Sequence, residues 1–180
     1  VGWDQVEGTD RYGIMSKYNW STDNRSTLFA LRETQLGNGE FYITTYISPT
    51  GGEYNSEWGF DTNGVGGYIN INEWTHIALV FEPSKRHEIY INGQLSAAKT
   101  TPAYKAWDNG LDLCIGAEIS PSSSNIFPRC LFHGNISNCC IFDKALTSGE
   151  MDWLYRNTYE SLLGGEQVRL NSYYHCKEDH

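Results

Sequence analysis

The sequence of 180 residues lacks the features by which a chain most often binds membranes or nucleic acids. No apolar run approaches the roughly 18 residues that a membrane-spanning helix needs. Lysine and arginine form no cluster, and with a formal net charge of −9 the protein repels phosphate backbones and anionic lipids. We therefore expect no membrane insertion and no nucleic-acid partner.

Helix-favouring residues are scarce as well. Alanine, leucine and lysine are sparse, whereas the chain holds 18 glycines and is 14% aromatic. This mixture is typical of many short strands joined by tight turns, and 180 residues suffice for one domain with a sizeable core. We predict an all-β domain.

Motifs of metal and nucleophilic chemistry are also missing. There is no Cys-x-x-Cys pair, and the adjacent Cys139 and Cys140 would point to opposite faces of a strand, so we expect no zinc. No serine or cysteine stands in a nucleophile-elbow context. The run 175–180 could chelate a metal through its histidines and cysteine, but a mobile polar terminus is the favoured interpretation.

Two weak signals indicate an oxidising compartment. Five cysteines are present, and three Asn-x-Ser sequons offer glycosylation sites at Asn19, Asn24 and Asn135. The chain begins at Val1 with neither an initiator methionine nor a signal peptide, so we expect a mature product or an excised segment. The expected location is extracellular or at the cell surface.

The most regular stretch of the sequence predicts a hairpin. Residues 74–81 are apolar on both sides of the pleat, which predicts a strand that is covered on both faces and lies centrally in a layered sheet. Residues 87–91 return as its partner. Asn92-Gly93 is the strongest short-range turn signal, because both residues tolerate a positive φ.

Shorter alternating runs predict further strands, and one helix is expected late in the chain. Thr147 and Glu150 have the spacing of a capping box, and apolar residues follow at helical intervals up to about Asn157. We place a domain at residues 1–163 and a polar tail, either linker or late strand, at 164–180. The other strands are expected at residues 12–18, 26–33, 40–47, 56–60, 67–71, 111–117 and 131–142.

A series of short motifs runs along the chain in the order Gly13-Ile-Met-Ser-Lys-Tyr, Trp74-Thr-His-Ile-Ala-Leu-Val, Ile89-Tyr-Ile-Asn-Gly, Leu113-Cys-Ile-Gly, Phe132-His-Gly-Asn-Ile and Ile141-Phe-Asp-Lys-Ala-Leu-Thr with Glu150. Over roughly residues 12–160 this order resembles the laminin-G-like, concanavalin A-like jelly roll. The resemblance implies a two-sheet antiparallel jelly-roll sandwich with one short C-terminal helix. It implies less about function, because the fold serves lectins, adhesion modules, glycanases and structural modules.

Hydrolysis of glycans is not expected. The glycanases among the proteins that the chain resembles carry a Glu-x-Asp-x-x-Glu run. Two carboxyl groups of such enzymes act as the acid and as the base or nucleophile, and they lie about 5 Å or about 6.5–9.5 Å apart, depending on the mechanism. The sequence contains no such run. Glu53, Glu57 and Asp61 are spaced by four, which is typical of a solvated loop. We therefore expect a non-catalytic protein.

Binding of glycans requires only aromatic rings that stack on a sugar and polar groups that bond its hydroxyls, sometimes around calcium. Alternate loops of a meander emerge at one end, which places Asp23 and Tyr54 at one rim, and the loop of Trp107 is an equally good candidate. Calcium is a candidate cofactor, and rings that pack a core are the structural alternative. The candidate ligand-binding residues are Trp20, Asp23, Tyr54, Trp58, Trp107, Asp108 and Asn109.

The cysteines carry a separate prediction. In the family pattern the position of Cys139 is apolar and inward, so Cys140 should face outward, where a flexible tail could bring Cys176 within bridging distance. We predict a Cys140–Cys176 disulfide and a reduced Cys139, with Cys114–Cys130 as a further pair across the loop between their strands. Cys130 and Cys139 appear on one extended strand, too far apart to bridge.

The expected function is a glycan- or protein-binding adhesion module of a larger extracellular protein. Its partners would be glycans, extracellular proteins, or other domains of the same chain or assembly. The first alternative is a structural module that packs against neighbouring domains or subunits. A glycoside hydrolase-like enzyme is the third hypothesis.

Overall fold

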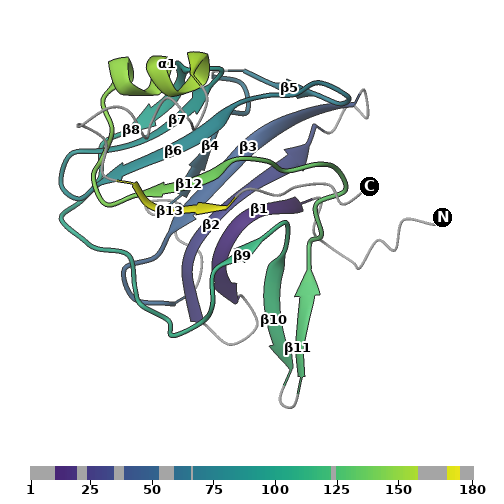
Figure 1. Cartoon of the computed structure of the whole chain (residues 1–180). Coiled ribbons are helices and arrows are strands. Elements are labelled where there is room, and N and C mark those ends of the chain that lie inside the picture. Colours follow the sequence, from purple (N-terminus) through teal and green to yellow (C-terminus); the bar gives the residue numbers. More distant parts are fainter. Residues whose placement is uncertain are drawn as a thin grey trace.

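The computed structural model describes residues 11–19, 24–34, 39–52, 59–65, 67–122, 125–157 and 170–174. These residues form two packed antiparallel sheets, two further strand pairs and one helix (Figure 1). The elements are β1 (Arg11–Asn19), β2 (Asn24–Glu33), β3 (Glu40–Ile47), β4 (Gly59–Asp61), β5 (Ile69–Asn70), β6 (Ile77–Glu82), β7 (Arg86–Ile91), β8 (Gln94–Lys99), β9 (Cys114–Ile115), β10 (Glu118–Ser122), β11 (Asn125–Arg129), β12 (Cys139–Phe142), α1 (Ser148–Arg156) and β13 (Leu170–Tyr174).

The larger sheet has the strand order β4-β3-β2-β1-β9, with β5 also paired to β3. Its central strands alternate as the sequence predicts. Phe29 and Ile43 face the second sheet within the main core, whereas Leu28 and Tyr46 belong to another buried cluster. A strand whose successive side chains point to opposite faces produces this division whenever both faces are covered.

The smaller sheet has the order β6-β7-β8 and is also covered on both faces. Ile89 packs against the larger sheet in the main core. On the other face, Val80 and Tyr90 pack with Leu146 and Met151, which lie before and within α1. The prediction of a two-layer sandwich, with a hairpin buried on both faces, is therefore confirmed.

The predicted central position of residues 74–81 is wrong. The strand begins at Ile77, the Trp74 side chain before it is 74% exposed, and β6 lies at the edge of its three-stranded sheet while β7 is central. Apolar residues on both sides of the pleat indicate that other parts of the protein cover both faces of the strand. They carry no information about neighbours beside it, so the pattern could not separate an edge strand from a central one.

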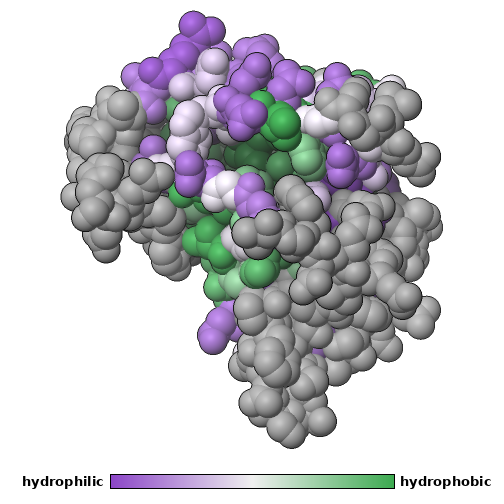
Figure 2. All heavy atoms as spheres, turned by 90° about the vertical axis from the view of Figure 1, so that its right-hand side faces the viewer, coloured by the Kyte–Doolittle hydropathy of each residue, from purple (hydrophilic) through white to green (hydrophobic). Residues whose placement is uncertain are grey.

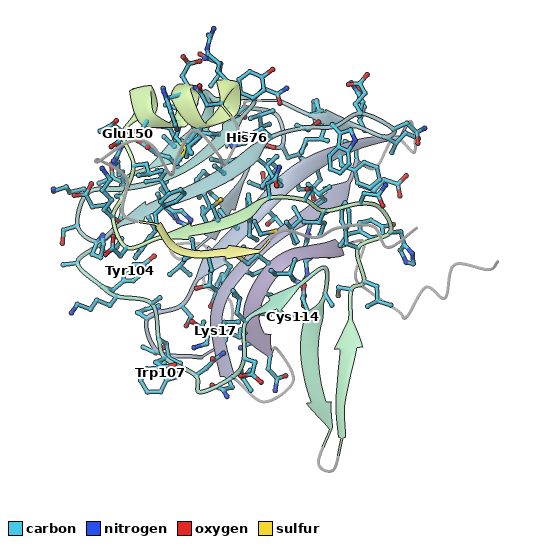
Figure 3. The ribbon with its side chains drawn as sticks, in the orientation of Figure 1. Lys17, His76, Tyr104, Trp107, Cys114 and Glu150 are labelled. Carbon is cyan, nitrogen blue, oxygen red and sulfur yellow. The ribbon has the colours of Figure 1, made fainter. Side chains whose placement is uncertain are left out.

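Two local predictions are confirmed. Asn92 and Gly93 turn between β7 and β8 with φ of 49° and 77°. Thr147 caps α1 through a capping box with Glu150, which Figure 3 labels beside the helix, and the helix ends before Asn157. Both signals are short-range, so they act with little help from the rest of the fold.

The segment predicted as one strand at residues 131–142 is wrong over most of its length. Only Cys139–Phe142 is a strand, and positive φ values at Cys130 (49°) and Asn138 (54°) bend the backbone on either side of an irregular stretch. The hairpin of β10 and β11 was not predicted. In the tail, β13 pairs antiparallel with β12, so residues 170–174 follow the late-strand interpretation.

A buried ion pair attaches the hairpin of β10 and β11 to the larger sheet. Arg11 and Glu118 approach through Nε and Oε1 at 2.6 Å and through Nη2 and Oε2 at 2.8 Å, and the Glu118 side chain is 1% exposed. Beside them, a β-carbon on Gly13 would lie 2.7 Å from the carbonyl carbon of Ala117. The two backbones therefore approach as closely as they do because residue 13 has no side chain.

The predicted alternation of the adjacent cysteines is confirmed, since Cys139 is buried and Cys140 is partly exposed. The predicted disulfides are not present. Cys114, Cys130 and Cys140 are all thiols, and Cys176 lies outside the described residues.

The register explains why Cys114 and Cys130 do not meet. Cys114 pairs with Ser16, whereas the carbonyl of Cys130 accepts a bond from the amide of Gly13. Three positions along β1 amount to about 10 Å, beyond the roughly 4.4–6.8 Å between Cα atoms that a disulfide spans.

No helix within the described residues is long and apolar enough to span a membrane. On the face drawn in Figure 2, hydrophilic residues gather at the upper end and apolar residues reach the surface below them. Large apolar side chains that are exposed include Val65, Ile71, Trp74 and Tyr155.

Candidate functional site

Three chain segments that are distant in sequence meet at one end of the sandwich. The amide of Trp107 donates to the carbonyl of Ser48 at 2.7 Å, and the amide of Arg25 donates to the carbonyl of Gly51 at 3.1 Å. We call this end the loop rim and define it as Lys17, residues 24–25, 48–52 and 107–111. Figure 3 shows Lys17 and Trp107 toward the lower left of the molecule.

Asn109 joins two of these segments through every polar group of its side chain. Its Nδ2 donates to the carbonyl of Lys17 at 2.8 Å and to that of Asn24 at 3.0 Å. Its Oδ1 accepts from the amide of Leu111 at 3.1 Å, and its own carbonyl accepts from Asn24 Nδ2 at 3.1 Å. A side chain held in this way keeps the 107–111 loop in one conformation on the end of the larger sheet.

Asp108 places a carboxylate at the surface beside this connection. Its Oδ1 accepts from Lys17 Nζ at 3.0 Å and from the amide of Gly110 at 3.2 Å, while the side chain remains 85% exposed. The hydrogen bond from Lys17, followed by that from Gly110, lowers the pKa of the Asp108 carboxyl group. The rim therefore presents a fixed carboxylate and a neighbouring ammonium group to solvent.

Trp107 adds a large apolar surface to these polar groups. The residue is 46% exposed although its amide is bonded to Ser48. The Ser48 hydroxyl in turn accepts from the amides of Thr50 at 3.3 Å and Gly51 at 2.8 Å, which orders the turn that follows Ser48. An exposed indole on a fixed loop offers stacking area to a ligand at little cost in conformational entropy.

The structure joins what the sequence left as two alternatives. Because the loop of Trp107 contacts Asn24 and Ser48, it lies at the same end as the β1–β2 and β3–β4 connections. The other candidate residues, Trp20, Asp23, Tyr54 and Trp58, lie outside the described residues.

Ser48 and Lys17 are rim residues that were not among the predicted binding residues. Ser48 precedes a proline directly after a strand, a pattern typical of a turn that a serine hydroxyl supports, so it could have been found. Lys17 could not, because its partner Asp108 lies 91 positions further along the chain.

The three sequons differ in accessibility. Asn19 is fully buried, and the Nδ2 atom of Asn24, to which a glycan would attach, donates to Asn109. Asn135 is exposed. In this fold Asn135 is therefore the sequon with room for a glycan.

Among the described residues no three acidic, histidine or cysteine side chains come together as a metal site. The acidic group of the rim, Asp108, is held by Lys17.

A known protein family matches most of the chain. A family model described as the concanavalin A-like lectin/glucanases superfamily matches residues 5–152. No curated protein matches the chain.

Two solved structures match the chain, one of them with a similar fold. One is a protein from Bacteroides ovatus provisionally named a carbohydrate binding protein, with 16% identity and a TM-score of 0.60 over 93% of this chain and 41% of that one. The other is an S-layer domain-containing protein from Clostridium thermocellum, with 18% identity and a TM-score of 0.38 over 86% of this chain and 67% of that one. The chain thus spans about two fifths of the Bacteroides protein.

Proposed function

The chain belongs to the concanavalin A-like lectin/glucanases superfamily, and from that premise we propose that it binds glycans at the loop rim without hydrolysing them. The observation that carries the proposal is the half-exposed indole of Trp107 beside the fixed pair of Asp108 and Lys17. An aromatic face can stack on the C–H groups of a sugar ring. A carboxylate and an ammonium group can accept from and donate to its hydroxyls.

Among the described residues, the carboxyl groups with a shifted pKa support binding over hydrolysis, while Glu53 and Glu57 lie outside the described residues. A glycoside hydrolase needs a carboxylic acid whose pKa is raised so that it can protonate the leaving group. Bonds from cations instead lower the pKa of the carboxyl groups of Glu82, Asp108 and Glu150, with Lys85, Lys17 and Lys144 as the first partners. Glu118, which is buried, is paired with Arg11.

We place the protein outside the cell as an adhesion module of a larger protein. The compartment rests on the exposed sequon at Asn135. The name of the Bacteroides structure, whose chain is more than twice as long as the matched part, is consistent with carbohydrate binding within a larger protein.

A second candidate function is packing against a neighbouring domain. It is favoured by exposed aromatic side chains away from the rim: Trp74 is 74% exposed, Tyr155 of α1 is 47% exposed, and Trp153 is 38% exposed. The His76 and Tyr155 rings lie 5.9 Å apart between their centroids, so part of this surface is contiguous. Exposed aromatics are typical of protein interfaces.

A glycan array, with and without calcium, tests the first proposal. If the rim binds glycans, Trp107→Ala should weaken binding at least about tenfold, since a central aromatic anchor contributes about 2 kcal/mol or more and about 1.4 kcal/mol corresponds to a factor of ten. Trp153→Ala, which removes an exposed indole from the helix, is the matched control and should bind as the wild type does. Equal binding by the Trp107 variant, or no binding to any glycan, would refute the proposal and leave the packing function.

A further inference from the structure

The ion pair of Lys17 and Asp108 presents a donor and an acceptor side by side at the loop rim. Lys17 Nζ lies 3.0 Å from Asp108 Oδ1, and the two side chains are 31% and 85% exposed. Most of the lysine side chain is therefore covered by protein, while its ammonium group meets the carboxylate at the surface. A ligand that reaches the rim encounters both groups together.

The Asp108 carboxylate is oriented through one of its two oxygens. Oδ1 accepts from Lys17 Nζ at 3.0 Å and from the amide of Gly110 at 3.2 Å. Oδ2 accepts no bond from the described residues. Because an ionised carboxylate offers about four acceptor positions, Oδ2 is left to accept from a ligand.

The Lys17 ammonium group also keeps donors for a ligand. Asp108 takes one of its N–H groups, and within the described part of the chain Nζ has no second acceptor. The backbone on both sides of the pair is tied together, because Asn109 Nδ2 donates to the carbonyl of Lys17 at 2.8 Å. The pair is thus held in place before a ligand arrives, which lowers the entropy cost of binding.

Two adjacent hydroxyls of a sugar ring match this pair. When they are gauche to each other, their oxygens are about as far apart as two hydrogen-bonded atoms, and Nζ and Oδ1 are 3.0 Å apart. One hydroxyl can donate to Asp108 Oδ2 while its neighbour accepts from Lys17 Nζ. Hydrogen bonds to charged groups are stronger than those between neutral groups, so both contacts favour such a ligand.

The charges around the pair favour a sugar without a charge of its own. Lys17 and Asp108 balance each other, and Lys105 and Asp112, which are exposed on either side of the Trp107 loop, are again of opposite sign. Arg25 is buried and presents little of its charge to a ligand. Since the whole chain has a formal net charge of −9, its field disfavours the approach of acidic sugars.

We infer that Lys17 and Asp108 make the rim specific for a neutral sugar unit with two adjacent free hydroxyls. The inference rests on the proposed function, since it names the class of glycan that the rim binds. Asp108 accepts from one hydroxyl, Lys17 donates to the next, and the neighbouring Trp107 offers its half-exposed indole to the ring. A substituent on either hydroxyl should weaken binding, because it removes the donated proton or obstructs the ammonium group.

Chemical-shift titration of the ¹⁵N-labelled chain with the methyl glycosides of glucose, galactose, mannose and glucuronic acid tests the inference. We expect a neutral glycoside to shift the amides of Lys17 and residues 107–111, and the glucuronide to bind more weakly. Monodeoxy analogues of the sugar that binds then identify its contacts. Loss of either of two adjacent hydroxyls should weaken binding about tenfold, since each bonds a charged group, and loss of any other hydroxyl should matter less.

Lys17→Met separates recognition from folding, because it keeps the length of the side chain and removes the ammonium group. It should weaken binding of the parent sugar about tenfold, and it should bind the analogue without the accepting hydroxyl as well as it binds the parent sugar. Asp108→Asn tests the donating hydroxyl in the same way if the lysine variant fails to fold. Lys85→Met, which breaks the ion pair with Glu82 outside the rim, is the matched control and should bind as the wild type does.

The outcomes separate this inference from the rim proposal. If Trp107→Ala removes binding but Lys17→Met changes neither the affinity nor the pattern of deoxy analogues, the inference is wrong and the rim proposal stands. Tighter binding of the glucuronide would overturn the assignment to a neutral sugar. Glycan binding on the array without shifts from any of the four glycosides would overturn the inference alone, whereas no binding in either experiment would overturn both.

Discussion

Asn109 shows how much of the loop rim depends on one side chain. Its amide group bonds two carbonyls of neighbouring strands and one amide of its own loop. Aspartate has nearly the same shape but cannot donate from its second oxygen when ionised. The residue is therefore selected by its donor group rather than by its size.

Replacing Asn109 should loosen the rim. Asn109→Ala leaves the carbonyls of Lys17 and Asn24 without their donor, and we expect a loss of about 1–3 kcal/mol in the free energy of unfolding, measured by urea denaturation. Asn109→Asp is the sharper test, because at neutral pH it sets a carboxylate against two carbonyl oxygens. It should be at least as destabilising as alanine. An aspartate variant as stable as the wild type would contradict this account of the donor.

At the scale of elements, the β7–β8 turn and α1 depend on each other. Gly93 has a φ of 77°, and a β-carbon there would lie 2.9 Å from Tyr155 Cβ and 3.1 Å from Asp152 Cα. The glycine therefore serves both the left-handed turn and the approach of the helix. The capping box of Thr147 and Glu150 starts the helix, but the contact with the turn holds it on the sheet.

Two glycine substitutions separate these roles. Gly64 also has a positive φ, 75°, but a β-carbon there would meet nothing within 4 Å. Gly64→Ala should cost about 1–2 kcal/mol from backbone strain alone. Gly93→Ala should cost more, because the helix must also move. Equal losses in thermal or urea unfolding would show that the helix contact contributes nothing.

At the scale of the whole molecule, His87 joins the two sheets. Its Nε2 lies 3.1 Å from Thr45 Oγ1 of the larger sheet, and its ring meets Phe60 and Phe81 with centroids 4.7 Å and 5.6 Å away. Burial, together with the charge of Lys99, lowers the pKa of His87 from 6.5 to about 3. The folded protein thus keeps this histidine neutral in acid that would protonate it in the unfolded chain.

Because the pKa of His87 is lower in the folded than in the unfolded chain, the stability of the protein should decrease in acid. Between pH 6.5 and about 3 the unfolded chain binds a proton at His87 that the folded chain does not, so stability is full above pH 6.5 and falls as the pH drops. The total effect is at most about 5 kcal/mol, at 1.36 kcal/mol for each pKa unit.

Urea denaturation between pH 3 and 8 measures this effect. His87→Gln should flatten the curve relative to the wild type, and the exposed His133→Gln should not. Parallel curves for the wild type and the His87 variant would show that another group sets the acid limit.

Local signals in the sequence were enough to predict several elements of the fold. The strand at 40–47, the Asn92-Gly93 turn and the capping box of α1 each depend on residues within a few positions of one another, and each is present as predicted. The jelly-roll sandwich also followed from the order of motifs, since the superfamily match covers residues 5–152. Alternation and turn chemistry act on short stretches of backbone, so a single sequence carries them.

Other features depended on contacts that no local pattern contains. The irregular stretch after Cys130 begins with a positive φ at a residue that rarely adopts one, and the strand pattern gave no warning of it. The edge position of β6 and the absence of a Cys114–Cys130 bond followed from which strands pair.

For the candidate site too, the sequence identified some of the residues, and only the fold brought them together. Trp107, Asp108 and Asn109 could be selected from the sequence, because an aromatic and polar run between strands is typical of a binding loop. Tertiary structure alone placed that loop beside Asn24 and Ser48, paired Asp108 with Lys17, and buried Asn19. Residue types and their spacing set what a segment can form, whereas pairing and packing over long sequence separations decide which segments meet and which side chains remain exposed.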